Sequence, residues 1–321
     1  MAKTSLLLFL SMLLHWACTS EPQNNNPQSE AKPSPQSIEV KEERNPDKRV
    51  DMESIAAIDS SQHNVYAWME EMDPKHALLN RMVPPKGFER IEVEKGDFAD
   101  WLRYLPLKEA GSPVRLYDGA LKGNQKVHEA VVDIDIGNRD LQQCADAVMR
   151  LKAEYHFSKA EFDQIHFNYT SGDKVAFADW AKGRKPIIEG RGVRFSSASG
   201  TTDYTYANFK KYLIQIYSYA GTASLSKELE AIPSSKLRAG DVFIQGGFPG
   251  HAVLVLDVAE NAAGERVFLI GQSYMPAQNI HILKNKEEEG LSPWYRVQEE
   301  GNFYSPEWTF DWGDLKRFVS E

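Results

Sequence analysis

Cysteine is nearly absent from this chain of 321 residues, which contains only Cys18 and Cys144. Cys18 lies at the end of an N-terminal apolar segment, and if it carries a lipid then Cys144 has no partner for a disulfide. Exported compartments favour disulfides. A lone thiol in an exported protein is therefore a feature that needs an explanation.

An excess of basic charge is also missing. Lys and Arg total 37 against 46 Asp and Glu, which gives a formal net charge of −9 at pH 7. A protein that binds nucleic acid usually presents a basic face, so we expect no nucleic-acid partner. The sequence also lacks the glycine motifs of Walker and dinucleotide-binding loops, and we expect no cofactor.

Long hydrophobic runs are confined to the first residues, which read MAKTSLLLFLSMLLHWAC. One lysine precedes an apolar stretch that is too short to span a bilayer stably, as in a secretory signal. The segment 1–18 is therefore predicted to be a signal peptide. Its final Cys18 resembles a bacterial lipoprotein processing site, although His15 and Trp16 depart from the usual small residues. A plain signal peptide with an incidental cysteine is the alternative.

The resemblance to a lipoprotein site implies a membrane partner and a location. Lipid on Cys18 would anchor the protein to a membrane of the cell envelope. Thr19 follows the cysteine where an aspartate would resemble an inner-membrane signal. We therefore expect the outer membrane.

The composition changes near residue 58. Residues 19–57 are rich in Pro, Asn, Gln, Ser and charge and cannot bury a core, so they are predicted to be a disordered tether. Aromatic residues recur from there to the end, without an internal repeat or a second tether. We predict a single globular domain over 58–321, with residues 161–202 as an inserted subdomain because they show no clear period.

A helix is predicted where apolar residues recur at helical spacing after NRD. Leu141, Cys144, Val148 and Tyr155 are among them. Asp140 followed three residues later by glutamine resembles a capping box, so Asp140 is the expected N-cap. This places Cys144 in the first turn or just beyond.

Three strands are predicted over 241–245, 251–258 and 266–273, joined by short glycine-containing links. Links of five and seven residues favour an antiparallel meander. The second link places residue 273, within two positions, opposite His251. His251 and Gln272 should therefore be neighbours at the same end of adjacent strands.

This arrangement suggests a nucleophile and its base. An amide oxygen on Gln272 would fix the tautomer of His251 and leave the other ring nitrogen free as a base. Backbone N–H groups and the helix dipole would favour a thiolate at Cys144. Gln142 or Gln143 could add side-chain donors to an oxyanion hole. Each residue alone has a structural explanation, because buried cysteine and packed histidine are common; together they indicate a site.

A metal site is the weaker possibility. His128, Asp133 and Asp135 lie close in sequence. His128 and Asp133 fall on opposite faces of the predicted strand, and polar residues on the solvent face of an edge strand explain them more simply. We therefore expect no metal.

Two resemblances add to this reading. The segment LRAGDVFIQGGFPGHAVLVLDV resembles the second half of NlpC-type cell-wall cysteine peptidases. It implies a papain-like fold with Cys144 as nucleophile, His251 as base and Gln272 as orienting residue. Those enzymes usually have Asp-Cys-Ser at the helix start where this chain has Gln-Cys-Ala, and they place fewer residues between cysteine and histidine.

The second resemblance covers nearly the whole globular part. The segments DIDIGNRDLQQCADAVMRLKAEY, YAGTASL, GQSYMPAQNIHILKN and PEWTFDW resemble a family of Bacteroidota lipoproteins, domain of unknown function 4846. That family implies the compartment and the single domain, and no activity.

The sequence thus predicts an α+β, papain-like domain. The expected function is an exported, membrane-tethered thiol hydrolase of amide bonds, acting on cell-wall peptide or another envelope polymer. A non-catalytic binding or structural lipoprotein on the same fold is one alternative. An acyl or peptidyl transferase is another.

Overall fold

The computed structural model describes residues 66–190 and 192–319. The predicted signal peptide (1–18), its Cys18 and the predicted tether (19–57) lie outside these residues. Among the described helices, none is both long and apolar enough to cross a membrane.

An antiparallel sheet of nine strands organises the described residues. The order is β2-β11-β10-β9-β8-β15-β7, with β1 beside β9 and β12 beside β10. Their bounds are β1 Phe88–Arg90, β2 His128–Val131, β7 Leu229–Ala231, β8 Val242–Gln245, β9 His251–Asn261, β10 Arg266–Gln272, β11 His281–Leu283, β12 Tyr295–Arg296 and β15 Leu315–Phe318.

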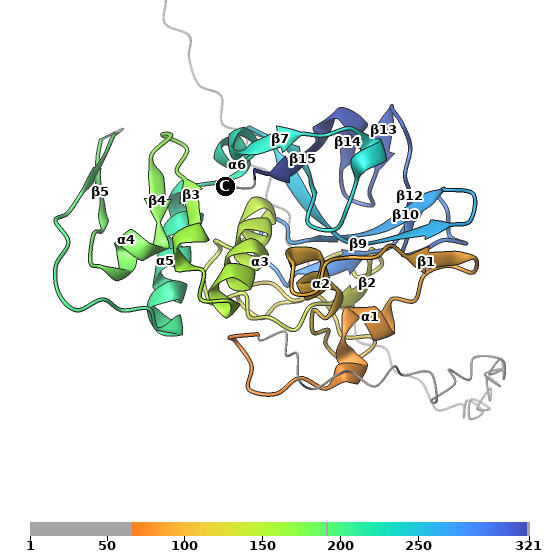
Figure 1. Cartoon of the computed structure of the whole chain (residues 1–321), viewed down its shortest axis with the longest axis horizontal. Coiled ribbons are helices and arrows are strands. Elements are labelled where there is room, and N and C mark those ends of the chain that lie inside the picture. The colour runs from red at the N-terminus through yellow and green to blue at the C-terminus, as the bar shows by residue number, and fades with distance from the viewer. Residues whose placement is uncertain (1–65, 191, 320–321) are drawn as a thin grey trace, which may run out of the picture. The chain divides into compact units, whose positions relative to one another are not determined.

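The predicted meander is confirmed as β8, β9 and β10 (Figure 1). The register differs slightly from the prediction. Phe268 pairs with Val258, two positions from the expected partner, and a bulge after Leu269 brings Ile270 opposite Val255, one position away. The bulge leaves an extra residue on β9, which a sequence pattern of uninterrupted apolar residues does not reveal.

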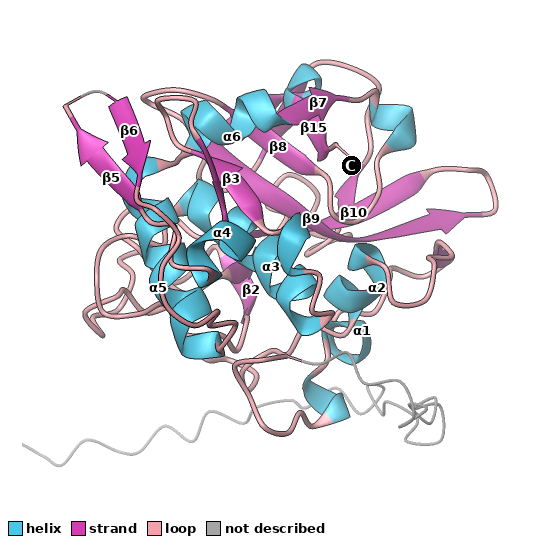
Figure 2. Ribbon diagram, turned by 60° about the vertical axis from the view of Figure 1, so that its left-hand side comes forward, coloured by secondary structure: helices cyan, strands magenta, loops and turns pink. Residues whose placement is uncertain are grey.

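Helices cover one face of this sheet (Figure 2). Helices α2 and α3 pack against β9, and α6 packs against β8. The fold is therefore α+β. The helix bounds are α1 Leu78–Arg81, α2 Phe98–Arg103, α3 Cys144–Ser158, α4 Phe177–Ala181, α5 Tyr206–Tyr219 and α6 Thr222–Glu228; short 3-10 turns are η2 Pro74–His76, η3 Phe162–Gln164, η4 Ser234–Lys236 and η5 Trp312–Asp314.

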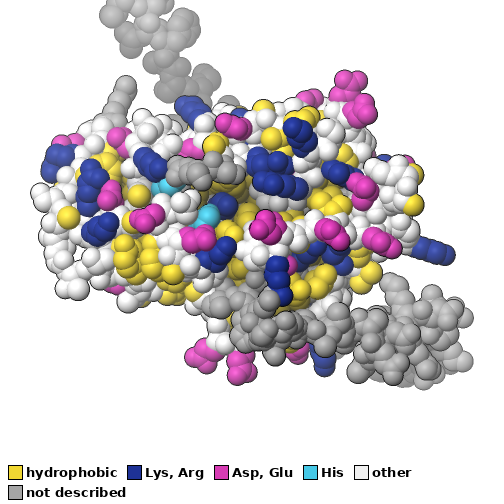
Figure 3. Space-filling view, in the orientation of Figure 1, with side chains coloured by type: hydrophobic (Ala, Val, Ile, Leu, Met, Phe, Trp, Pro, Cys, Tyr) yellow, Lys and Arg dark blue, Asp and Glu magenta, His cyan; other side chains and the backbone are white. Residues whose placement is uncertain are grey.

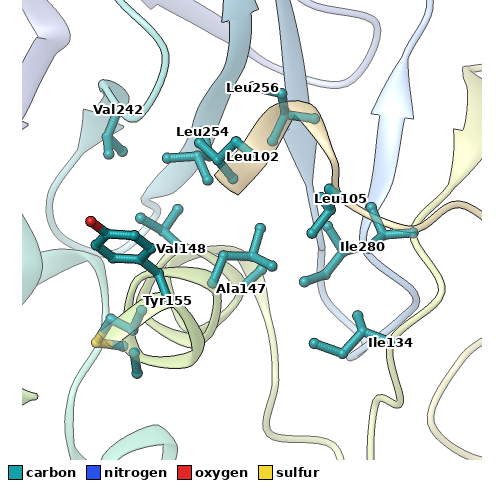
Figure 4. Packing of buried hydrophobic residues seen from close by; sticks show 14 of the residues in the cluster. Leu102, Leu105, Ile134, Ala147, Val148, Tyr155, Val242, Leu254, Leu256 and Ile280 are labelled. Atoms are coloured by element: carbon teal, nitrogen blue, oxygen red, sulfur yellow. The ribbon is translucent and has the colours of Figure 1, made fainter. Parts of the chain in front are cut away.

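Alternating side chains of β9 enter two different cores. Leu254 and Leu256 point to the helical face, where they meet Val148 of α3 and Leu102 of α2 (Figure 4). Val253 belongs to the opposite core, with aromatic side chains of a hairpin formed by β13 (Asn302–Tyr304) and β14 (Thr309–Asp311). Each fully buried aliphatic side chain contributes roughly 1.5–3 kcal/mol. Burial on both faces explains why β9 reads as a continuous apolar run.

A buried carboxylate ties the helical layer to the sheet. Asp257 on β9 has no exposed surface and accepts from Arg90 Nε of β1 at 2.5 Å and from Arg103 Nε of α2 at 2.8 Å. Two cations around one buried anion satisfy its charge. The pair of arginines therefore anchors β1 and α2 to the central strand.

The segment predicted as an inserted subdomain forms small elements outside the main sheet. They are η3, the hairpin of β3 (His166–Asn168) with β4 (Lys174–Ala176), helix α4, and the hairpin of β5 (Pro186–Glu189) with β6 (Gly192–Phe195). Phe167 and Phe177 nevertheless lie in the same core as α3. The segment is thus an elaboration that shares the main core.

Candidate functional site

The turn between β8 and β9 delivers His251 to the first position of β9. It packs closely on α6, because a Cβ at Gly246 would overlap the side chain of Ser226 and a Cβ at Gly250 would overlap that of Thr222. Thr222 Oγ1 also donates to the carbonyl of Gly247 at 3.1 Å. The glycines therefore allow the chain to turn tightly against the helix just before the histidine.

His251 and Gln272 are neighbours, as the strand arithmetic predicts. Nε2 of the imidazole lies 2.9 Å from Oε1 of the amide, and both side chains are 1% exposed. A hydrogen bond to a carbonyl-type oxygen requires that Nε2 carry the proton.

Glu307 determines which end of the Gln272 amide faces the histidine. The amide nitrogen of Gln272 donates to Oε2 of Glu307 at 2.7 Å. A carboxylate only accepts hydrogen bonds, so the amide must present its nitrogen to Glu307 and its oxygen to His251. This leaves Nδ1 of His251 as the unprotonated nitrogen, which is the atom able to act as a base.

Sequence reasoning did not find Glu307. It lies at the tip of the β13–β14 hairpin, 35 residues from Gln272. Lys122 is in a short ion pair with it. Burial would raise the pKa of Glu307, but the nearby imidazole of His281, whose Nε2 lies 3.9 Å from Oε2, and the ion pair with Lys122 outweigh burial and lower the pKa to about 2. Glu307 is thus a carboxylate throughout the physiological range.

His281 is the second residue that the sequence analysis missed. It pairs directly with Gln272 across β10 and β11, and its Nε2 lies 3.4 Å from the Gln272 amide nitrogen. Its Nδ1 donates to the carbonyl of Asn279 at 2.8 Å. Extending the meander by one more strand would have predicted this neighbour.

Cys144 is the first residue of α3, which agrees with its predicted place in the first turn. The expected N-cap, Asp140, is wrong. The N-cap is Gln143, whose backbone N–H donates to Oδ2 of Asp146 at 3.0 Å. Asp140 instead accepts from the backbone N–H of Ala277 at 2.7 Å, so a tertiary contact takes its side chain away from the helix.

The expected thiolate at Cys144 is also wrong for this structure. Burial, and then the nearby carboxyl of Asp146, raise the pKa of the Cys144 thiol to about 11. Hydrogen bonds from the backbone N–H groups of Ala145 and Ala252 oppose this rise but do not cancel it. Desolvation therefore raises the pKa of the thiol by more than the helix N-terminus lowers it, and the thiol is neutral at pH 7.

His251 is neutral at pH 7 as well. Burial lowers the pKa of its ring to about 4, and the hydrogen bond that the ring donates to Gln272 and the charge of Glu307 offset only part of that effect. The rings of Tyr274, Trp308 and Phe310 surround it, with centroids 4.7, 5.3 and 5.9 Å away. These rings keep water from the imidazole.

The sulfur of Cys144 and the imidazole of His251 approach the start of β9 from opposite faces of the sheet. The His251 ring packs with Phe310 on the face opposite α3. Cys144 lies at the start of α3 on the helical face, where the N–H of Ala252, next to His251, faces its sulfur. Tyr274 touches the His251 ring, and a charge on Cys144 would raise its pKa. The structure thus places His251 and Gln272 in contact and brings Cys144 to the backbone next to His251.

The sequence model of a family described as Domain of unknown function (4846) matches residues 78–317, which is most of the chain. The chain belongs to this family. No curated protein and no solved structure matches it.

In this member of the 4846 family, the two glutamines before Cys144 have other partners than a substrate. Gln142 is buried, and its Oε1 accepts from Nη1 of Arg150 at 3.1 Å. Gln143 donates from its side chain to Asp140 Oδ1 at 3.0 Å. The side-chain donor of Gln143 is therefore engaged at the start of α3, whereas the amide nitrogen of Gln142 is buried without a hydrogen-bond partner among the described residues.

The residues considered for a metal are also dispersed. Nε2 of His128 lies 3.1 Å from the carbonyl oxygen of Ser112, and Asp135 pairs with Arg150 and Lys210. Within residues 66–190 and 192–319, no group of three His, Cys, Asp or Glu side chains is arranged to hold an ion.

Two exposed apolar side chains flank the site in this family member. Phe248, in the turn before His251, is 96% exposed, and Met275, just after the end of β10, is 58% exposed. Phe248 follows the end of β8 and Met275 follows the end of β10. Both strand ends lie at the end of the sheet where β9 begins. An apolar group bound at this edge would lie beside His251 and Gln272.

Proposed function

We propose that this protein is an exported, lipid-anchored thiol hydrolase that cleaves amide bonds in cell-wall peptide. One observation carries the proposal. Nε2 of His251 is held by Gln272 at 2.9 Å, and the neighbouring N–H of Ala252 faces the sulfur of Cys144. A nucleophile, a base and an orienting group on three separate elements are what a two-step acyl transfer requires.

The first step begins from a neutral pair. Nδ1 of His251 takes the proton of the Cys144 thiol as the sulfur attacks the carbonyl carbon of the amide. The S–C bond forms, the C–N bond breaks, and the imidazolium gives its proton to the departing amine. In the second step His251 activates water, which attacks the thioester, releases the carboxylic acid and restores the thiol.

The oxyanion is stabilised by backbone groups in this proposal. The first N–H groups of an α-helix have no acceptor within the helix. Those of Cys144 and Ala145 face the sulfur, which places them beside the carbonyl carbon that the sulfur would attack. They supply donors in place of the Gln143 side chain, which donates to Asp140.

Three features favour a papain-like arrangement of the NlpC type. The cysteine begins a helix, the histidine begins a strand that packs against that helix, and the amide lies on the next antiparallel strand. Glu307 is an addition to this set that fixes the amide of Gln272.

The cellular location is inferred from the sequence alone. The apolar N-terminal segment ending at Cys18 and the polar stretch 19–57 suit a lipid anchor followed by a tether. An anchor on the outer membrane would place the domain within reach of peptidoglycan.

A second candidate follows from the burial of the site. His251 is 1% exposed and the pKa of Cys144 is raised to about 11. These values favour an envelope lipoprotein that keeps the fold for binding or for structure and does not catalyse a reaction.

The two candidates are separated by incubation with purified peptidoglycan peptides. The full chain carrying Cys18→Ser should release new amino groups, and water labelled with oxygen-18 should place one heavy oxygen in the new carboxyl group. Cys144→Ala and His251→Gln should each abolish release. An added amine that is incorporated in place of water would show a transferase. Peptides that bind and remain intact would establish the non-catalytic candidate.

A further inference from the structure

A cavity of about 700 Å³ lies along the second half of α3, away from Cys144. Its walls are α3, the start of α2, the β3 strand, the turn at 238–241 and the end of β15. In Figure 1, α3 lies near the middle of the described residues with β3 to its left, and over that region Figure 3 shows hydrophobic, basic, acidic and histidine side chains together. Its volume falls within the range of small-molecule sites.

Lys152 is the principal cation of this cavity. Its Nζ lies 4.8 Å from the ring centre of Phe98, 5.4 Å from that of Tyr155 and 5.5 Å from that of Phe318. Aromatic faces attract the ammonium, but they provide no oxygen to receive its three N–H donors. Burial lowers the pKa of Lys152 to about 8.

The carboxylates in the wall of the cavity already have donors. Asp97 accepts from the N–H of Asp100 at 2.7 Å, and Glu228 accepts from the N–H of Asn168 at 3.0 Å. The third, Asp241, is held by two bonds from Arg317, at 2.6 and 2.9 Å.

Two cations are left with donors unused. Within the described residues, neither Lys152 Nζ nor the guanidinium of Arg238 donates a hydrogen bond or lies in an ion pair. The two are close enough that the charge of Arg238 lowers the pKa of Lys152. The cavity therefore offers the partly buried ammonium of Lys152 and the exposed guanidinium of Arg238 beside an aromatic wall.

We propose that this cavity binds a small organic anion whose acidic group lies between Lys152 and Arg238 and whose apolar body packs on Phe98 and Phe318. An anion would receive the unused donors, and charge-assisted bonds of this kind are stronger than neutral ones. An inorganic anion would leave the aromatic wall uncovered, and a neutral hydrophobic molecule would leave both cations unpaired. The site is independent of the thiol chemistry proposed at Cys144.

The test uses 8-anilinonaphthalene-1-sulfonate, an aromatic anion whose fluorescence reports binding, with the full chain carrying Cys18→Ser. Lys152→Met keeps the apolar stem and removes the charge, and it should raise the dissociation constant about tenfold or more. Lys152→Arg should retain most of the affinity. Lys126→Met, an exposed lysine outside the cavity, should have no effect. Displacement by phenylacetate or by phenyl phosphate distinguishes a carboxylate ligand from a phosphate.

A second measurement leaves the cavity residues unsubstituted, so its result does not depend on whether a variant folds. Reductive methylation followed by peptide mass spectrometry should show Lys152 protected by the bound probe, while Lys126 is modified at the same rate. The proposal is overturned if the probe leaves Lys152 unprotected. It is equally overturned if the neutral analogue N-phenyl-1-naphthylamine binds as tightly as the sulfonate, or if Lys152→Met binds the sulfonate normally.

Discussion

The imidazole of His251 and the side-chain amide of Gln272 form a hydrogen bond of 2.9 Å between adjacent antiparallel strands. The same amide donates to Glu307 at 2.7 Å, so its orientation is determined by a carboxylate. The chain of three groups fixes which ring nitrogen carries the proton. Each of the first three predictions below depends on that chain or on the burial around it.

The first prediction concerns the tautomer of His251. At pH 7 the ring should be neutral and protonated at Nε2, and long-range proton–nitrogen NMR spectra should show this single form. In Gln272→Leu the accepting oxygen is lost, and the two neutral tautomers should both be populated. His76, which lies outside the site, provides an internal control in the same spectra. A ring protonated at Nδ1 in the unsubstituted protein would contradict the account.

The second prediction concerns the reactivity of Cys144. With the pKa of the thiol raised to about 11, only about one molecule in ten thousand is a thiolate at pH 7. Alkylation by iodoacetamide in a chain carrying Cys18→Ser should therefore be slow at pH 7 and rise about tenfold per pH unit between pH 8 and 10.

His251→Gln is the matched variant for this measurement. Because the imidazole is neutral over that pH range, the variant should follow the same alkylation profile. Fast alkylation near pH 6 that disappears in His251→Gln would instead reveal a preformed thiolate–imidazolium pair.

The third prediction concerns the acid limit of amide hydrolysis. His251 must be unprotonated to accept the thiol proton, and burial lowers its pKa to about 4. Activity should therefore persist below pH 6 and be lost as the pH falls through about 4. Trp308→Ala would admit water to the ring and raise its pKa towards 6.5, moving the limit upward. A limit near pH 6.5 in the unsubstituted protein would show that the ring is solvated.

The fourth prediction concerns Asp146, whose pKa is raised to about 8 by burial, while hydrogen bonds from backbone N–H groups oppose the rise. Its protonated form is favoured in the folded state. The stabilisation that Asp146 contributes is therefore complete below the pKa of its carboxyl in the unfolded chain, near 4, and is lost as the pH rises to 8. Asp146→Asn cannot ionise. Between pH 5 and 7.5, the free energy of unfolding of the unsubstituted protein should therefore fall more steeply than that of Asp146→Asn. The difference between the two slopes should be about 1.4 kcal/mol per pH unit.

Denaturant unfolding at several pH values measures this difference. Asp163→Asn, on an exposed position of η3, is the control and should run parallel to the unsubstituted protein. Parallel curves for Asp146→Asn as well would mean that Asp146 ionises normally in the folded state.

Local patterns predicted the meander and the His251–Gln272 contact because a strand alternates its side chains and a short link restricts the register. The bulge near Leu269 was not predicted, because residues 252–256 of β9 are apolar on both faces and show no alternation that an extra residue would interrupt. The register error was nonetheless small enough to keep the two side chains together.

The N-cap shows why local signals can mislead. Asp140 with Gln143, and Gln143 with Asp146, have the same spacing, so the sequence offers two overlapping caps. The structure uses the second because Ala277, far away in the chain, occupies the Asp140 side chain. The thiol was misjudged for a related reason. The effect of a helix N-terminus can be read locally, whereas the burial that raises the pKa of Cys144 depends on distant segments.

Acylation of Cys144 is the most direct test of the proposed hydrolase. An aryl ester at pH 7.5 should transfer its acyl group to Cys144 in the chain carrying Cys18→Ser, detected by peptide mass spectrometry. His251→Gln should slow this acylation by about 10²–10⁴-fold, as expected for a lost general base, and should leave alkylation at pH 10 nearly unchanged. Equal acylation rates in the two proteins, or a Cys144 that reacts only after unfolding, would contradict the account.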